Sequence, residues 1–111
     1  MIRIDDVWLA TQPLDMRAGI DSVLARVITV FGAAHPHTAY LFANLRANRM
    51  KVLVHDGIGF WLAARRLHQG HFVWPNSAVQ TQLALSRVQL DALVLGLPWA
   101  RLGEGGIITV V

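Results

Sequence analysis

A continuous apolar stripe between Met16 and Phe31 is the feature that most constrains how this chain can fold. Apolar side chains recur there at steps of three and four residues, which places them on one side of an α-helix. The stripe consists of Met16, Ile20, Val23, Leu24, Val27, Ile28 and Phe31. We therefore predict a helix over residues 16–31, with Asp15 as its N-cap and Gly32 at its C-terminal end. Arg17 and Asp21 would pair on its solvent face.

Three segments around this helix have the composition of β-strands. Val7–Thr11 precedes the helix, and Thr38–Asn44 and Met50–His55 follow it. The last segment alternates, so Val52 and Val54 should face one side of a sheet and Leu53 the other. The polar residues 45–48 would connect the second and third strands. Asp56-Gly57 then supplies the left-handed backbone positions that a tight hairpin turn needs.

Residues 58–67 fit two structures. Period-two alternation of Phe60, Leu62 and Ala64 indicates a strand, whereas the run from Ala63 to Leu67 is also good helix material. We favour a strand because the segment follows one hairpin turn and precedes a second at residues 68–70. His71–Trp74 would be its antiparallel partner, and residues 76–82 would form a polar linker.

Ser86 and Gln89 have the spacing of a capping box, which predicts a short helix from residue 88 or 89 to Leu95. Gly96 and Pro98 would end it. Together these elements predict a single α+β domain over residues 1–100, with an antiparallel sheet (a meander) of about four strands and two helices packed on one face. Residues 101–111 would be a C-terminal tail, either an edge strand or disordered.

Composition limits the classes of protein to which the chain can belong. It has no cysteine, which excludes disulfides, zinc knuckles and thiol nucleophiles. No apolar run approaches the roughly 20 residues that span a bilayer, and the N-terminus lacks the layout of a signal peptide. The net charge of +3 points weakly to an anionic partner. We expect a cytoplasmic protein with no membrane contact.

Four blocks of the chain, in order between residues 7 and 99, resemble one family. They are Trp8-Leu9-Ala10-Thr11 with Asp15-Met16-Arg17 and Gly19; Tyr40-Leu41-Phe42 with Arg49-Met50-Lys51-Val52-Leu53; Asp56-Gly57-Ile58-Gly59-Phe60 with Arg65-Arg66-Leu67, Gly70, Phe72, Trp74 and Pro75; and Gln89-Leu90 with Leu93, Gly96 and Trp99. The pattern is similar to that of the small accessory proteins (TnpB or second-open-reading-frame type) of insertion sequences of family sixty-six.

The resemblance implies a bacterial mobile-element protein that assists a separate, larger transposase, which carries the catalytic residues. The expected function is therefore an accessory role in DNA transposition, with DNA at the element ends and the cognate transposase as partners. The alternative is a protein–protein adaptor or oligomeric scaffold without direct DNA contact. Such an adaptor would use apolar surface such as residues 107–111 or exposed Trp side chains. A homo-oligomer is left open.

The candidate nucleic-acid-binding residues form a basic set in the central strands. They are Arg46, Arg49, Lys51, Arg65 and Arg66, with Arg17 as an outlier. Guanidinium groups would hold phosphates bidentately without reading bases. Trp61 and Trp74 are candidates for stacking on a base or wedging a groove. The competing interpretation is a solvated sheet face whose Trp residues belong to the core. Arg65 and Arg66 cannot both face one way on a regular strand.

We predict neither a catalytic centre nor a metal site or cofactor. Asp15 and Asp56 are explained as a cap and a turn residue, and the remaining acidic residues form no recognisable cluster. His68 and His71 have a plausible ligand spacing, but no carboxylate accompanies them in a recognisable arrangement.

Overall fold

The computed structural model describes residues 2–75 and 79–100, so the predicted tail at 101–111 and residues 76–78 of the predicted linker lie outside the described part. In chain order the elements are β1 (Asp6–Ala10), α1 (Ile20–Phe31), β2 (Thr38–Ala43), β3 (Arg49–His55), β4 (Phe60–Arg66), β5 (Gln82–Leu85) and α2 (Arg87–Val94). None of the helices in this part is long and apolar enough to span a membrane.

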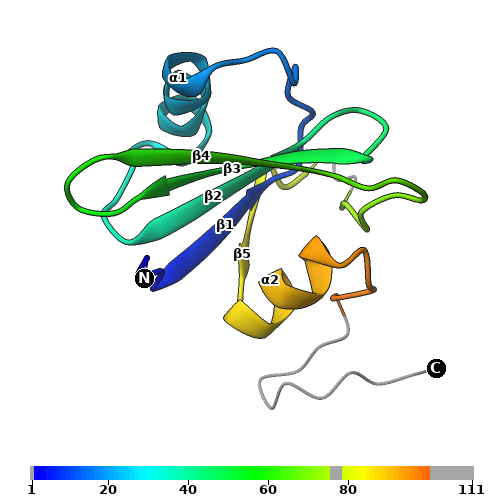
Figure 1. Ribbon diagram of the computed structural model, residues 1–111. Coiled ribbons are helices and arrows are strands. Elements are labelled where there is room, and N and C mark those ends of the chain that lie inside the picture. The colour runs from blue at the N-terminus through cyan, green and yellow to red at the C-terminus, as the bar shows by residue number, and fades with distance from the viewer. Residues whose placement is uncertain (1, 76–78, 101–111) are drawn as a thin grey trace.

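The strands form one five-stranded sheet in the order β4-β3-β2-β1-β5 (Figure 1). The α+β class is confirmed, with one strand more than the predicted four or so. Strands β2, β3 and β4 form an antiparallel meander, whereas β1 and β2 are parallel because α1 connects them as a crossover. The additional strand, β5, starts at the end of the predicted linker and pairs antiparallel with β1. At four residues it has too little pattern to be recognised from the sequence.

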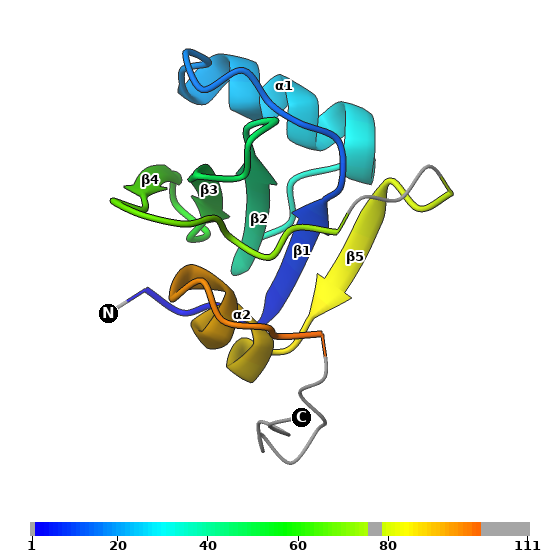
Figure 2. The ribbon, with the colours of Figure 1, turned by 90° about the vertical axis from the view of Figure 1, so that its right-hand side faces the viewer.

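The two helices cover opposite faces of the sheet, so the prediction that both pack on one face is wrong (Figure 2). The physical reason is that β2 is buried along its whole length, so its side chains need a core on both sides. Leu41 joins Leu90 and Leu93 of α2 in one core. Tyr40 joins Val23 and Val27 of α1 in the other. A sheet that is apolar on both faces requires a cover on each.

Helix α1 begins at Ile20 rather than at Met16. Its N-cap is Gly19, which has no side chain to make a capping hydrogen bond, so the predicted capping role of Asp15 is wrong. Arg17 binds Asp15 in the preceding loop instead of the predicted Asp21. The predicted end is confirmed, because Gly32 adopts the left-handed conformation (φ 87°) and its N–H donates to the carbonyl of Ile28.

Residues 60–66 form a strand, as favoured, but residues 71–74 are not its partner. After Gly70 (φ 79°) the chain leaves the sheet and crosses the core on the α2 side. There the Phe72 N–H donates to the Ala47 carbonyl, and the Phe72 ring is buried. Burial of this ring against the sheet face outweighs pairing with an exposed edge strand. The Ser86–Gln89 capping box of α2 is present as predicted.

Candidate nucleic-acid interface

One end of the sheet gathers three arginines of the predicted set. Arg49 begins β3, Arg66 ends β4, and the two are direct partners in the antiparallel ladder. Arg46 is exposed in the turn that joins β2 to β3. Together with Arg17, described below, these residues are called the basic end of the sheet. Paired residues in a ladder share a face, so Arg49 and Arg66 project to the α1 side, on the same face as Lys51 and Leu53.

The turn that carries Arg46 is fixed by Asn44. The side-chain oxygen of Asn44 accepts hydrogen bonds from the backbone N–H groups of Asn48 and Arg49, both at 3.1 Å. Ala47 completes the turn with a left-handed backbone (φ 56°). His71 then joins the turn to a distant segment, because its Nδ1 lies 2.7 Å from the Arg46 carbonyl oxygen. The backbone under Arg46 is therefore held, while its side chain is free to reach outward.

The loop before α1 brings Arg17 to the same end. Its guanidinium binds the Asp15 carboxylate at 2.8 Å, and its backbone N–H donates to the same group. Hydrogen bonds from Arg17, with a smaller effect of Lys51, lower the pKa of Asp15 to about 2. Both side chains are largely exposed, so the pair keeps a carboxylate within the basic end rather than building a buried charge site.

Two open hollows lie at this end and share Met16 and Arg49. The first, about 530 Å³, lies between the loop before α1 and the β2–β3 turn. Its charged lining comprises Asp15, Arg17, Arg46 and Arg49. The second, about 360 Å³, lies over the ends of β3 and β4, where Arg49, Lys51, Arg65 and Arg66 line it. Open, shallow hollows with cationic rims fit an extended anionic surface better than a small enclosed ligand.

Two of the five predicted basic residues hold the fold together. The Lys51 ammonium group donates to the Ala18 carbonyl at 2.6 Å, which ties β3 to the loop before α1. Arg65 projects to the α2 side, and its Nε donates to the Val94 carbonyl at 2.6 Å. That carbonyl belongs to the last residue of α2, where a cation also complements the helix dipole. As expected, Arg65 and Arg66 face opposite ways.

The two candidate stacking residues lie in different surroundings. Trp74 is partly buried against the core on the α2 side, and its Nε1 donates to the Ala10 carbonyl at 2.9 Å. Trp61 is 53% exposed, and its Nε1 donates to the Asp56 carboxylate at 2.7 Å. It lies near the start of β4, whereas Arg66 lies at its end, about 17 Å away at the usual rise per residue. The Trp61 ring therefore does not stand beside the arginines, whereas Trp74 lines a small hollow with Leu45 and Ala47, the neighbours of Arg46 in its turn.

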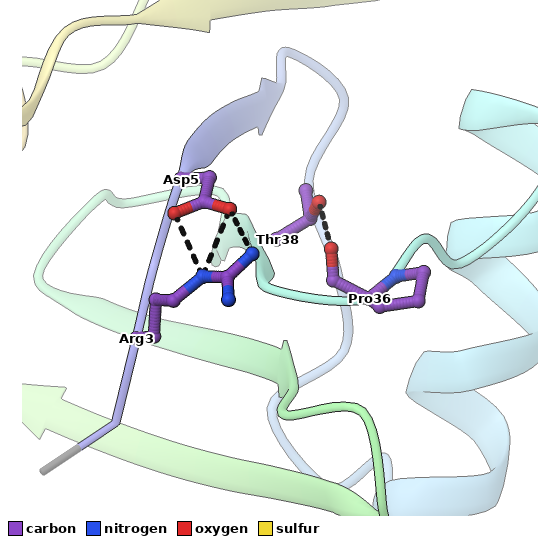
Figure 3. Close-up of polar contacts among 4 residues, drawn as sticks. All are labelled: Arg3, Asp5, Pro36 and Thr38. Carbon is purple, nitrogen blue, oxygen red and sulfur yellow. Dashed lines mark hydrogen bonds and ion pairs between the residues drawn. The ribbon is translucent and has the colours of Figure 1, made fainter.

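Three arginines of the basic end differ from the other arginines that the structure describes, because no hydrogen bond or ion pair engages their guanidinium groups. Within residues 2–75 and 79–100, no carboxylate pairs with Arg46, Arg49 or Arg66. By contrast, Arg3 pairs with Asp5 at 2.8 Å beside β1, near the Thr38–Pro36 contact at the opposite end of the sheet (Figure 3). On α2, Arg87 pairs with Asp91. Within the described residues, the arginines whose guanidinium groups have no bonding partner are thus gathered at one end.

Comparison with protein families identifies the chain. Residues 5–104 match the family described as IS66 Orf2 like protein. The chain belongs to this family. The resemblance found in the sequence is thereby confirmed, and it makes the chain a transposition-associated accessory protein of an insertion sequence rather than a member of a known enzyme class.

Two relatives of this IS66 Orf2 like chain come from Sinorhizobium fredii (strain NBRC 101917 / NGR234). The uncharacterized protein y4hO is 38% identical over 95 residues, which cover 84% of this chain and 81% of the relative. The uncharacterized protein y4jC is 31% identical over 97 residues, covering 86% and 81%. The likeness therefore extends over the domain rather than one motif. No solved structure matches the chain.

For this IS66 Orf2 like domain, the part of the chain that the structure describes holds no group of three or more His, Asp or Glu side chains arranged to bind a metal ion. Arg17, the outlier of the predicted basic set, joins the basic end in the structure. Its place in the basic end depends on how residues 11–19 fold back to the β2–β3 turn, and no local pattern in the sequence signals that contact. The nearest signal is the Asp15-Met16-Arg17 block itself.

Proposed function

We propose that this accessory protein binds duplex DNA at the ends of its insertion sequence through the basic end, where Arg46, Arg49 and Arg66 hold backbone phosphates. One observation carries the proposal: Arg49 and Arg66 are direct ladder partners, and no carboxylate of the described residues forms an ion pair with either. In an antiparallel pair the Cβ atoms of opposite residues are about 4.5–5.5 Å apart, and like charges there repel. A phosphate between two guanidinium groups would turn that repulsion into two charge-assisted contacts.

The arrangement favours phosphate contacts over base readout. The three arginines lie on a turn and on two strand ends, and no helix or ribbon of the described residues projects beyond them to enter a groove. Contacts to phosphate fix position and orientation but carry no sequence information of their own. Any preference for element ends would then come from DNA shape or from the transposase. Lys51 and Arg65 support the proposal indirectly, because their hydrogen bonds hold β3 and β4 at this end.

The experiment that tests the proposal is a fluorescence anisotropy titration of the purified chain onto a labelled duplex of the element's terminal repeat. A scrambled duplex runs alongside, and both are measured between about 50 and 200 mM salt, where phosphate contacts lose most of their affinity. We expect binding that weakens steeply with salt. Tighter binding to the terminal repeat would indicate recognition of ends, and equal binding would indicate a clamp that relies on the transposase for its site.

Matched variants separate the basic end from net charge. Arg49→Glu and Arg87→Glu change the charge equally, but Arg87 lies on α2 and is already paired with Asp91. Arg49→Glu should abolish binding, and Arg87→Glu should reduce it only slightly. Absence of binding by the unmodified chain at low salt would contradict the proposal. That result would favour the alternative, an adaptor that reaches DNA only through the transposase.

A further inference from the structure

Among the residues that the structure describes, strand β4 forms a free edge of the sheet. It is the last strand in the order β4-β3-β2-β1-β5, and Figure 2 shows it at the rim with α1 on one side and α2 on the other. Six of its seven residues are exposed, and the exception is Leu62. No proline or lysine blocks it. Soluble proteins normally protect an edge of this length, because its unpaired backbone groups invite another strand.

The hydrogen-bond pattern fixes which backbone groups of β4 point outward. The Leu67 N–H donates to Asn48, and the Asp56 N–H donates to Gly59, so both pairs are hydrogen-bonded pairs of the β3–β4 ladder. Such pairs alternate along an antiparallel ladder. Trp61, Ala63 and Arg65 therefore direct their N–H and C=O groups toward β3. The outward-pointing groups belong to Phe60, Leu62, Ala64 and Arg66.

A second copy of β4 matches this pattern in one register that uses the whole strand. Antiparallel pairing centred on Ala63 aligns Leu62 with Ala64 and Phe60 with Arg66 of the second copy, and all four are residues whose backbone groups point outward. Trp61 then lies opposite Arg65 of the second copy, on the α2 side. The centre has only small Ala side chains. Registers shifted by two residues also pair outward-pointing backbone groups with one another. They align fewer residues of the strand, however, and they do not place Trp61 opposite Arg65.

Charge complementarity supports the same register. The start of β4 is the acidic end of the strand, because the Asp56 carboxylate accepts hydrogen bonds from the Ile58 and Gly59 N–H groups and from Trp61 Nε1. The other end carries Arg65 and Arg66. Antiparallel pairing brings the cationic end of one strand to the acidic, aromatic end of the other. An Arg over an exposed Trp face adds a cation–π contact.

We propose that the protein forms a symmetric homodimer in which β4 pairs antiparallel with β4 of a second copy, centred on Ala63. The pairing would join the two sheets into one continuous sheet and remove both long exposed edges. It would also place the Arg49–Arg66 pairs of both copies on the same face of that sheet. The dimer does not depend on DNA binding, and the residues that test it are distinct from Arg46, Arg49 and Arg66.

Single-cysteine variants of the full chain test the register, because the chain has no cysteine of its own. Across the symmetry axis, the two Ala63 residues would be a pair whose Cβ atoms are about 4.5–5.5 Å apart, close to disulfide geometry. The neighbouring Ala64 is equally small and also exposed, but its two copies would be offset by two residues along the strand, with Cα atoms more than about 7 Å apart. We expect Ala63→Cys to oxidise to a covalent dimer and Ala64→Cys to remain largely uncrosslinked.

Two variants that introduce opposite charges at residue 61 test the same interface without a crosslink. Trp61→Glu and Trp61→Lys both remove the indole ring. The carboxylate introduced by the first would form an ion pair with Arg65 of the second copy, whereas the ammonium group introduced by the second would repel it. In sedimentation velocity the unmodified chain and Trp61→Glu should be dimeric and Trp61→Lys monomeric, with far-UV circular dichroism confirming that all are folded. A monomeric unmodified chain would overturn the proposal. So would equal crosslinking of the two cysteine variants, or a dimer that neither cysteine variant captures.

Discussion

Arg49 and Arg66 lie directly opposite each other across the β3–β4 ladder, and both lack an acidic partner among the residues that the structure describes. Two like charges in this position destabilise a sheet, whereas opposite charges stabilise it. The pair therefore weakens the isolated fold, and an anion bound between the two guanidinium groups would relieve that cost. Stability and DNA binding should then respond in opposite directions to the same substitution.

Replacing Arg66 by Glu should make the protein more stable and a poorer DNA binder. The new carboxylate would face Arg49 as an opposite charge, and we expect the free energy of unfolding to rise by about 0.2–1 kcal/mol. Urea denaturation measures this change, and anisotropy measures the loss of DNA affinity. Arg46→Glu is the matched control, because Arg46 lies in a turn with no cation opposite: it should weaken DNA binding without the gain in stability. A loss of stability in Arg66→Glu would contradict the interpretation.

Substitutions of Lys51 and Arg49 should distinguish a residue that stabilises the fold from one that binds DNA. Lys51→Met removes the ammonium group that donates to the Ala18 carbonyl at 2.6 Å, and a hydrogen bond involving a charged group contributes about 1.5–3 kcal/mol. Lys51→Met should therefore lower the free energy of unfolding by roughly that amount. Arg49→Met has no such bond to lose and should leave stability unchanged or slightly higher. The slope of log affinity against log salt should become shallower by about 0.9 for Arg49→Met, one phosphate contact. Equal effects of the two variants on that slope would show that Lys51 also contacts phosphate.

Trp74 should behave as a core residue. Trp74→Phe keeps an aromatic ring but leaves the Ala10 carbonyl without its donor, now at 2.9 Å from Nε1. We expect the free energy of unfolding to fall by about 1 kcal/mol, with further loss from the smaller ring, and DNA affinity to stay unchanged. Thermal denaturation and anisotropy on the same preparation measure both. A loss of affinity at unchanged stability would instead support the predicted stacking role.

Sequence patterns predicted those parts of the fold that local chemistry determines. The inward face of α1 at Val23 and Val27, the alternation in β3 and the Ser86–Gln89 capping box each appear in the structure, because period and spacing specify them. The predicted stripe is only partly correct, since Ile20 and Ile28 are exposed. Long-range packing decided the rest. Residues 71–74 look like a strand, yet burial of Phe72 removes them from the sheet. The two-sided burial of β2, and hence the helices on opposite faces, depends on the whole topology.

In the candidate site, too, some features follow from local sequence patterns and others depend on long-range packing. Arg49 and Arg66 could be recognised as members of a basic set, but their direct pairing depends on the β3–β4 register. The roles of Lys51 and Arg65 depend on backbone carbonyls far along the chain, at Ala18 and Val94. No spacing rule relates a side chain to such a carbonyl. Composition therefore indicates an anionic partner, which stays a prediction, and the structure was needed to show which basic residues bond to backbone carbonyls.

Asp15 should link the acid stability of the protein to the proposed affinity for DNA. Hydrogen bonds from Arg17 lower the pKa of Asp15 from its ordinary value of 3.8 to about 2. A carboxyl group whose pKa is lowered by folding contributes stability above its unfolded-state pKa and loses it as the pH falls through the folded-state value. The contribution of Asp15 should therefore be constant at neutral pH and disappear between about pH 4 and pH 2.

The variant Asp15→Asn should reveal the effect of Asp15 on acid stability and its effect on DNA affinity. The difference in free energy of unfolding between the unmodified chain and Asp15→Asn should shrink as the pH falls from about 4 towards about 2, as urea denaturation at each pH would measure. Asp5 and Asp56 also have lowered pKa values, so both proteins should still lose stability in acid.

At neutral pH, Asp15→Asn removes the one carboxylate that lines the larger hollow and releases Arg17. DNA affinity should then rise and depend more steeply on salt, because an additional guanidinium group becomes free for phosphate. Unchanged affinity would show that Arg17 lies beyond the reach of the bound duplex and would restrict the interface to Arg46, Arg49 and Arg66.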